Sequence, residues 1–165
     1  MNVLENATNK QQVDSDEVAS LLIPMEQRML LLPTVSVAEM VPWEMPVPVL
    51  NAPDWFLGMF LWREQQVPLL SFEVINGEAR APIHNRCRVA ILNNTGESED
   101  LPFIAIATQG IPRLARVNER EISQLGDVVV KSFELMHVSL AGELAIIPNI
   151  AALEQAYLGY SQTRA

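Results

Sequence analysis

The chain has 165 residues, of which 49% are apolar and 19% are charged, so it is long enough for one domain with a substantial hydrophobic core. Its net charge of −9 argues against nucleic-acid binding, because lysine and arginine must neutralise the phosphates in such complexes. All uninterrupted apolar stretches are far shorter than the ~20 residues that span a bilayer, and no secretory signal is recognisable, so neither membrane insertion nor export is predicted.

The first half of the chain predicts a tail, a hairpin and a stiff connection. Residues 1–17 are polar and predict a mobile tail, and residues 18–165 then form a single domain of two β subdomains. Apolar runs on both sides of the polar residues 26–28 predict a hairpin of two short strands. Residues 36–41 allow one or two helical turns. Four prolines within residues 42–53 predict an extended connection, since each proline restrains itself and its predecessor.

The second half predicts further strands and one helix. Apolar runs at 55–62 and 67–72 flank the polar residues 63–66 and predict a second hairpin. Further strands are predicted at residues 86–92, 103–107, 114–117, 128–138 and 143–147, with a loop at 76–85 and a polar turn at 118–126. Apolar residues at 150, 153, 157 and 158 fit one face of a helix. Nine or ten short strands and a terminal helix predict an all-β barrel or sandwich.

Few residues indicate catalysis. His84 and Cys87 have the spacing of two metal ligands, but a structural zinc site takes four, and His137 is the only other histidine or cysteine. Glycine-rich phosphate loops and nucleophile-elbow motifs are missing, and the paired carboxylates lie in polar loops. We therefore expect no enzyme activity, no metal and no cofactor. Cys87 is expected to pack as a small apolar residue, and a lone cysteine agrees with a cytoplasmic location.

The most unusual stretch lies between residues 47 and 72. A strand with two tryptophans ends at Arg63 and Glu64, whose charges either solvate a turn or belong to a recognition surface. Gly58 lies in the middle of this strand, where glycine marks a bulge or the close approach of another backbone. Both features favour a role in protein interaction over a role in catalysis.

This stretch resembles the CheW family, the adaptor domains of bacterial chemosensory arrays. The sequence TVSVAEMV at 34–41 matches a short V-x-x-E segment of the family, with Glu39 in its acidic place. The sequences PDWFLG at 53–58, LWRE at 61–64 and PLLSF at 68–72 follow the family's core pattern around its N-L-R-G block. Arg63 is kept from that block, whereas Leu61 replaces the asparagine and Glu64 replaces the glycine. The likeness covers about residues 19–158.

The resemblance implies an all-β fold of two interleaved, small SH3-like β-barrels on a shared apolar core, with a short C-terminal helix. It implies a non-catalytic adaptor that couples the cytoplasmic tip of a methyl-accepting chemoreceptor to the regulatory domain of a CheA-type histidine kinase. Arg63 is then expected in a receptor-facing groove between the barrels. The other expected protein-binding residues are Val37, Glu39, Gly58, Trp62 and Glu64. The altered N-L-R-G block resembles accessory, ChpC-type adaptors of type IV pilus (twitching) systems.

Two alternatives stay open. A small-ligand-binding or enzymatic β-barrel would need an internal apolar cavity with a few convergent polar groups, and a pocket-free core would exclude it. A CheW-like domain that has lost signalling would act as a passive spacer or competitor, and it would bind only one of the two partners.

Overall fold

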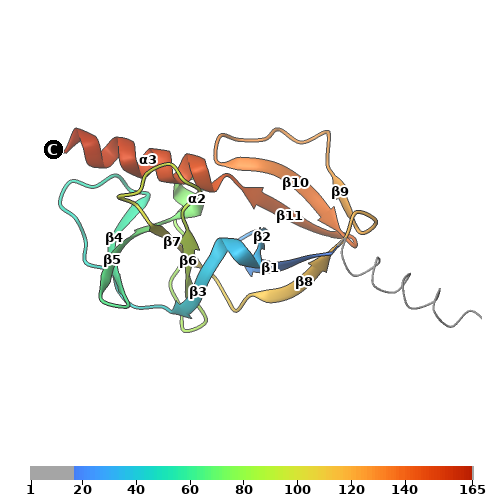
Figure 1. The fold of residues 1–165 in the computed structure, drawn as a ribbon, viewed down its shortest axis with the longest axis horizontal. Helices are drawn as coiled ribbons and strands as arrows, with labels where there is room; N and C mark the ends of the chain where they lie inside the picture. The colour runs from blue at the N-terminus through green and yellow to red at the C-terminus, as the bar shows by residue number, and fades with distance from the viewer. Residues whose placement is uncertain (1–16, 165) are drawn as a thin grey trace, which may run out of the picture.

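The computed structural model describes residues 17–164, so the predicted mobile tail lies outside the described residues except for Glu17 (Figure 1). The elements in chain order are β1 (Val18–Pro24), β2 (Met29–Pro33), a 3₁₀ turn (Thr34–Ser36), β3 (Val37–Pro42), β4 (Phe56–Trp62), β5 (Gln65–Leu70), α2 (Phe72–Ile75), β6 (Arg88–Asn93), β7 (Phe103–Thr108), β8 (Arg113–Val117), β9 (Ile122–Gln124), β10 (Glu134–Leu140), β11 (Glu143–Pro148) and α3 (Ile150–Thr163).

The strands form two sheets whose chain segments are interleaved. One sheet has six strands in the order β8-β1-β2-β11-β10-β9, and the other has five in the order β3-β6-β7-β5-β4. The chain starts in the six-stranded sheet, builds the whole five-stranded sheet, and then returns to the first sheet at β8 (Figure 1). This arrangement confirms the predicted all-β class.

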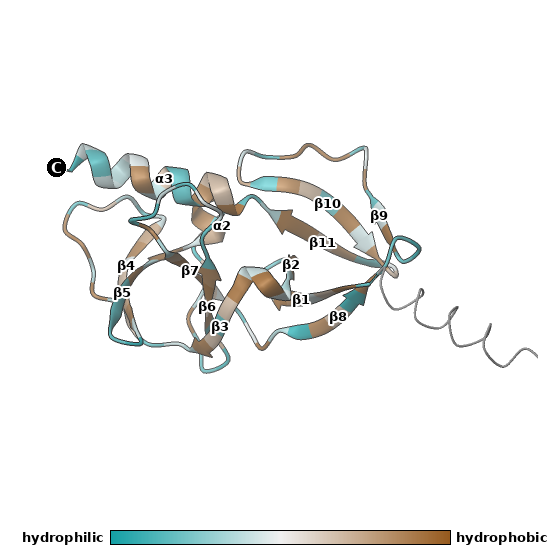
Figure 2. Ribbon diagram, viewed as in Figure 1, coloured by the Kyte–Doolittle hydropathy of each residue, from teal (hydrophilic) through white to brown (hydrophobic). Residues whose placement is uncertain are grey.

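A shared hydrophobic core joins the two sheets. It takes Leu30 from β2 and Ile146 from β11, which are paired in parallel, together with Leu92 and Ile106 from the five-stranded sheet. Leu153 of α3 completes this core and is fully buried. Figure 2 colours β6 and β11 brown over most of their length, which agrees with strands that are apolar on both faces.

The C-terminal helix fastens one sheet to the other. It follows β11 of the six-stranded sheet and lies along the five-stranded sheet (Figure 1). Its buried Glu154 carboxylate accepts hydrogen bonds from the Thr95 backbone N–H at 2.8 Å and from the Thr95 hydroxyl at 2.5 Å. The helix extends five residues beyond the last apolar position that the sequence pattern identified.

A buried polar cluster also joins the six-stranded sheet to the end of α2. The Glu134 side chain of β10 is fully buried and accepts four hydrogen bonds, from the Lys131 backbone N–H at 2.9 Å, His137 Nε2 at 2.8 Å, Asn76 Nδ2 at 3.0 Å and Arg28 Nη1 at 3.5 Å. Burial by itself would raise the pKa of this carboxyl, but the three shortest of these hydrogen bonds hold the pKa below its ordinary value.

Four predicted elements were wrong in part. Within the segment 36–41 only Ser36 belongs to a helical turn, the 3₁₀ turn; residues 37–41 lie in β3, which pairs along β6 and whose valines favour an extended backbone. Residues 128–133 are not a strand: Val129 is 85% exposed, and strand propensity alone does not hold a segment that has no ladder. The polar turn predicted at 118–126 contains the short strand β9, which pairs with the end of β10. Phe72 begins α2 rather than ending a strand.

A candidate interaction site at the β4–β5 hairpin

The hairpin between β4 and β5 turns in two residues, Arg63 and Glu64. Both have a positive φ, 47° and 63°, as a type I′ turn requires. Glycine and asparagine adopt this conformation with little strain, which explains in physical terms why glycine suits position 64. Glu64 takes up the same backbone conformation despite its side chain.

Glu39, Trp62 and Arg63 form one connected cluster at this hairpin. The Trp62 indole Nε1 donates a hydrogen bond to Glu39 Oε2 at 2.6 Å, and Arg63 Nη2 lies 3.3 Å from the same oxygen. The Arg63 guanidinium carbon also lies 4.9 Å from the centroid of the Trp62 ring. Because β3 and β4 are the outer strands of the five-stranded sheet, the cluster links its two edges.

The cluster has a buried base and an exposed top. Trp62 is buried and its ring packs edge-on against Phe103, with centroids 4.8 Å apart. The Arg63 side chain is 67% exposed, and Leu61 beside it is 60% exposed. An arginine held over an aromatic ring by a carboxylate loses less conformational entropy when it binds a partner than a free one does.

Gly58 lies both at a β-bulge and where another backbone segment approaches closely, the two features predicted for a glycine in the middle of a strand. Its φ is +134°, and a Cβ there would lie 2.4 Å from the Val47 carbonyl oxygen. Val47 and Met59 exchange two backbone hydrogen bonds of 2.8 and 2.9 Å, and the β4–β5 register shifts between Phe56 and Gly58. The close backbone approach and the bulge are therefore both confirmed. Gly58 is buried, so any effect on a partner would act through the segment that Val47 anchors.

The six residues expected to bind a partner are only partly brought together. Glu39, Trp62 and Arg63 are in contact, and Glu64 is the next residue of the turn. Val37 is partly buried and packs against the shared core, opposite Leu92. The polar and cation–π contacts of Arg63 all lie within the five-stranded sheet, and its place in a groove between the barrels stays a prediction.

Cys87 is buried, as expected. Its Sγ accepts a hydrogen bond from the His84 backbone N–H at 3.3 Å, so the pair anchors a loop. Within residues 17–164, no three His, Cys, Asp or Glu side chains are grouped so that they could hold a metal. In the same part of the chain, no helix has both the length and the apolar character needed to cross a bilayer.

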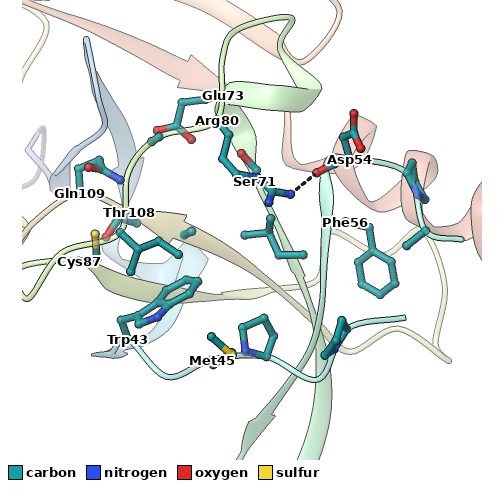
Figure 3. Close-up of a pocket in the computed structure, with 18 of the residues that line it drawn as sticks. Trp43, Met45, Asp54, Phe56, Ser71, Glu73, Arg80, Cys87, Thr108 and Gln109 are labelled. Atoms are coloured by element: carbon teal, nitrogen blue, oxygen red, sulfur yellow. Dashed lines mark hydrogen bonds between the residues drawn. The ribbon is translucent and has the colours of Figure 1, made fainter. Parts of the chain in front are cut away.

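A cavity of about 350 Å³ at the mouth of the five-stranded barrel was missed by the sequence analysis (Figure 3). Its floor includes Leu57 and Ala107, which pack against the interior of that barrel. Its walls are residues 43–54 and the loop at 80–87, and its polar lining residues include Ser71, Glu73 and Arg80. The proline-dense segment at 42–53 could have indicated the cavity. Prolines keep this segment out of the β-sheet hydrogen bonding, so its apolar side chains remain around the cavity opening. The cavity opens to the surface and does not lie within the packed core, and the ligand-binding alternative stays a prediction.

Two interleaved sheets on a shared core, followed by a C-terminal helix, define a β-rich domain of two small barrels. The sequence model of the CheW-like domain matches residues 19–156, and the chain belongs to the CheW-like domain family. The scaffolding protein TtCheW from Thermoanaerobacter tengcongensis has a similar crystal structure, with a TM-score of 0.68 over 80% of this chain and 88% of that chain. At 13% sequence identity, this likeness concerns the fold. No curated protein sequence matches the chain.

Proposed function

We propose that this protein is a non-catalytic adaptor of a bacterial chemosensory system, which couples the cytoplasmic tip of methyl-accepting receptors to the regulatory domain of a CheA-type histidine kinase. Membership of the CheW-like domain family supports this function, as does the fold shared with a scaffolding protein. The observation that carries it is the cluster of Glu39, Trp62 and Arg63, which presents an exposed cation on a fixed aromatic base.

The cluster suits reversible binding. Arg63 is already oriented by Glu39, so an acidic group of the partner can pair with it at a small entropic cost. Such a contact contributes about 1–3 kcal/mol when it is partly desolvated. A whole interface of micromolar affinity corresponds to about 8 kcal/mol, and an array of many adaptors adds avidity without tighter single contacts.

The divergent hairpin supports a more specific assignment within this proposal. Leu61 and Glu64 stand where the family block has asparagine and glycine, and both are exposed beside Arg63. A partner that meets this hairpin therefore meets an apolar and an acidic side chain next to the arginine. We propose on this basis that the protein is a ChpC-type accessory adaptor of a type IV pilus (twitching) system and acts in the cytoplasm.

The test is a binding measurement with a receptor-tip fragment and, separately, the kinase regulatory domain. Arg63→Glu should weaken receptor binding at least tenfold while the melting temperature stays within a degree or two, because Arg63 is exposed and its ion pair contributes little to folding. Arg120→Glu makes the same charge change at an exposed turn of the other sheet, and it should leave binding unchanged. Binding of only one partner would contradict the bridging role and indicate a passive spacer or competitor.

A further inference from the structure

The cavity at the mouth of the five-stranded barrel has the size and lining of a small-molecule site. Its volume of about 350 Å³ lies within the range of roughly 300–1,000 Å³ that is typical of ligand pockets. Trp43, Phe56 and Leu57 provide apolar and aromatic surface, and Ile83 of the loop at 80–87 also lines the cavity. Barrel mouths are among the places where such sites usually occur.

A buried carboxyl group lines one end of this cavity. Glu73 lies in the first turn of α2, which Ser71 caps by accepting a hydrogen bond from the Val74 backbone N–H at 3.3 Å. The residue is only 4% exposed, and in the view of Figure 3 its carboxyl group lies above Gln109. The helix thus fixes an acidic group where the cavity is otherwise mostly apolar.

Glu73 has no positive partner among residues 17–164. No arginine, lysine or histidine of this part of the chain forms an ion pair with it, and its nearest backbone donor from another residue is the Glu26 N–H at 3.4 Å. The side-chain charges that act on it are those of Glu26 and Glu78, and both are negative. Burial raises the pKa of the Glu73 carboxyl, and these two charges act in the same direction.

Arg80 is the only cation that lines the cavity in the described part of the chain, and it is already engaged. It is exposed, and its Nη2 donates a hydrogen bond of 3.1 Å to the Asp54 carbonyl oxygen, which connects the two walls of the cavity (Figure 3). Because water screens an exposed charge far more than a buried one, Glu73 dominates the field that a bound molecule would feel.

We propose that this cavity binds a small amphipathic amine, whose ammonium group pairs with the Glu73 carboxylate and whose apolar body packs against Trp43, Phe56 and Leu57. The amine supplies the counter-charge that residues 17–164 do not provide, and a buried charge is costly without a partner. The two aromatic rings also attract a cation. This site does not include Arg63 and does not depend on the adaptor role.

The proposal is tested by isothermal titration calorimetry at pH 7.5 on the full chain, with phenethylamine, 2-phenylethanol and phenylacetate as matched probes. We expect saturable binding of phenethylamine, binding of the alcohol at least tenfold weaker, and no binding of the anion. Glu73→Gln should weaken the amine at least tenfold, whereas Glu64→Gln, an exposed glutamate outside the cavity, should not change it. Quenching or enhancement of tryptophan fluorescence should follow the same isotherm, since Trp43 lines the site.

Ile83→Trp provides a second variant on an exposed loop, should Glu73→Gln fail to fold. The indole ring is larger than the isoleucine side chain, so it should obstruct the cavity and weaken the binding of phenethylamine without removing the carboxylate. Three results would each overturn the proposal. They are equal binding of the three probes, preferential binding of phenylacetate at Arg80, and no saturable binding at millimolar amine. The proposal would also be overturned by a Glu73→Gln variant that weakens only the binding of the receptor or kinase, because the site would then serve a protein partner.

Discussion

Trp62 and Glu39 close the five-stranded barrel through a side-chain hydrogen bond of 2.6 Å between the indole Nε1 and Oε2. Their strands, β4 and β3, pair with β5 and β6 respectively and share no ladder with each other. One indole and one carboxylate therefore connect two sheet edges, and the same carboxylate orients Arg63. The stability of the barrel and the geometry of the proposed binding surface are linked at this oxygen.

Trp62→Phe should separate the packing of the ring from its hydrogen bond. The phenyl ring keeps part of the contact with Phe103, but the Glu39 carboxylate loses its indole donor. We expect the free energy of unfolding to fall by about 1–3 kcal/mol in urea denaturation. Glu39→Gln is the matched variant, since its amide oxygen still accepts from the indole while the pair with Arg63 loses its charge. Glu39→Gln should therefore reduce receptor binding more than it reduces stability. Equal losses of stability in Glu39→Gln and Trp62→Phe would contradict the assignment of the stabilising contact to the indole hydrogen bond.

Glu64→Gly should stabilise the protein. The φ of +63° strains a residue with a side chain by roughly 1–2 kcal/mol, and glycine relieves that strain at some cost in unfolded-state entropy. The net gain is expected to be about 0.5–1 kcal/mol, seen as a higher melting temperature. Gln66→Gly, at an exposed position of β5, should instead destabilise, and a loss of stability in both variants would show that the turn is not strained.

Gly58→Ala should destabilise the protein and displace the segment anchored by Val47. A Cβ at position 58 would lie 2.4 Å from the Val47 carbonyl oxygen, which is backbone and cannot rotate away. Overpacking and an unfavourable φ together predict a loss of about 2 kcal/mol or more. Faster hydrogen exchange at Val47 and Met59 should accompany the loss. Gly159→Ala, on the exposed face of α3 where a Cβ meets open space, should stabilise the protein by up to ~1 kcal/mol.

Glu134 should make the protein sensitive to acid. Its pKa is lower in the folded chain than its ordinary value of 4.5, so its contribution is complete above that pH and is lost as the pH falls through the folded-state pKa. Urea denaturation from pH 7 to pH 3 should show a decline in unfolding free energy that Glu134→Gln makes smaller. Glu99→Gln, at an exposed turn, should leave the decline unchanged. An unaltered profile for Glu134→Gln would contradict the assignment.

Glu73 should have the opposite pH dependence. Its pKa is raised in the folded chain, so the folded state holds the proton more tightly than the unfolded state does. The stability that this protonation provides is present below the ordinary pKa and is lost as the pH rises through the folded-state pKa. Glu73→Gln should therefore be more stable than the wild type at neutral pH, and the difference should shrink on acidification. A difference that grows in acid would rule this out.

The sequence predicts best what depends on neighbouring residues. The hairpins β1–β2 and β4–β5 follow from apolar runs around short polar turns, and Gly58 follows from its place within a strand. β9 could not be predicted, because three residues in a polar turn become a strand only when β10 lies beside them. Likewise Glu39, Trp62 and Arg63 were each identified by resemblance to a family. The contact of Trp62 and Arg63 with the same Glu39 oxygen depends on how the barrel closes, and the local sequence does not indicate that.

The cavity was missed for a related reason. The position of residues 43–54 depends on contacts distant in sequence, among them the bridge between Val47 and Met59 and the hydrogen bond from Arg80 to Asp54, which no local pattern indicates. Glu73 follows a strand in the sequence and reads as an ordinary charged residue at the start of a loop. Only the packing of α2 against the rest of the chain buries it.

The interleaving of the chain also determines how a mechanical load passes through the molecule. The five-stranded barrel leaves the six-stranded sheet after β2 and rejoins it at β8, and α3 adds a third joint where Glu154 binds Thr95. A pull or twist on one barrel is therefore shared by two covalent joints and one hydrogen-bonded joint, rather than by a single hinge. Three connections of this kind oppose rotation of one sheet against the other, so the two sheets should respond to load as one body.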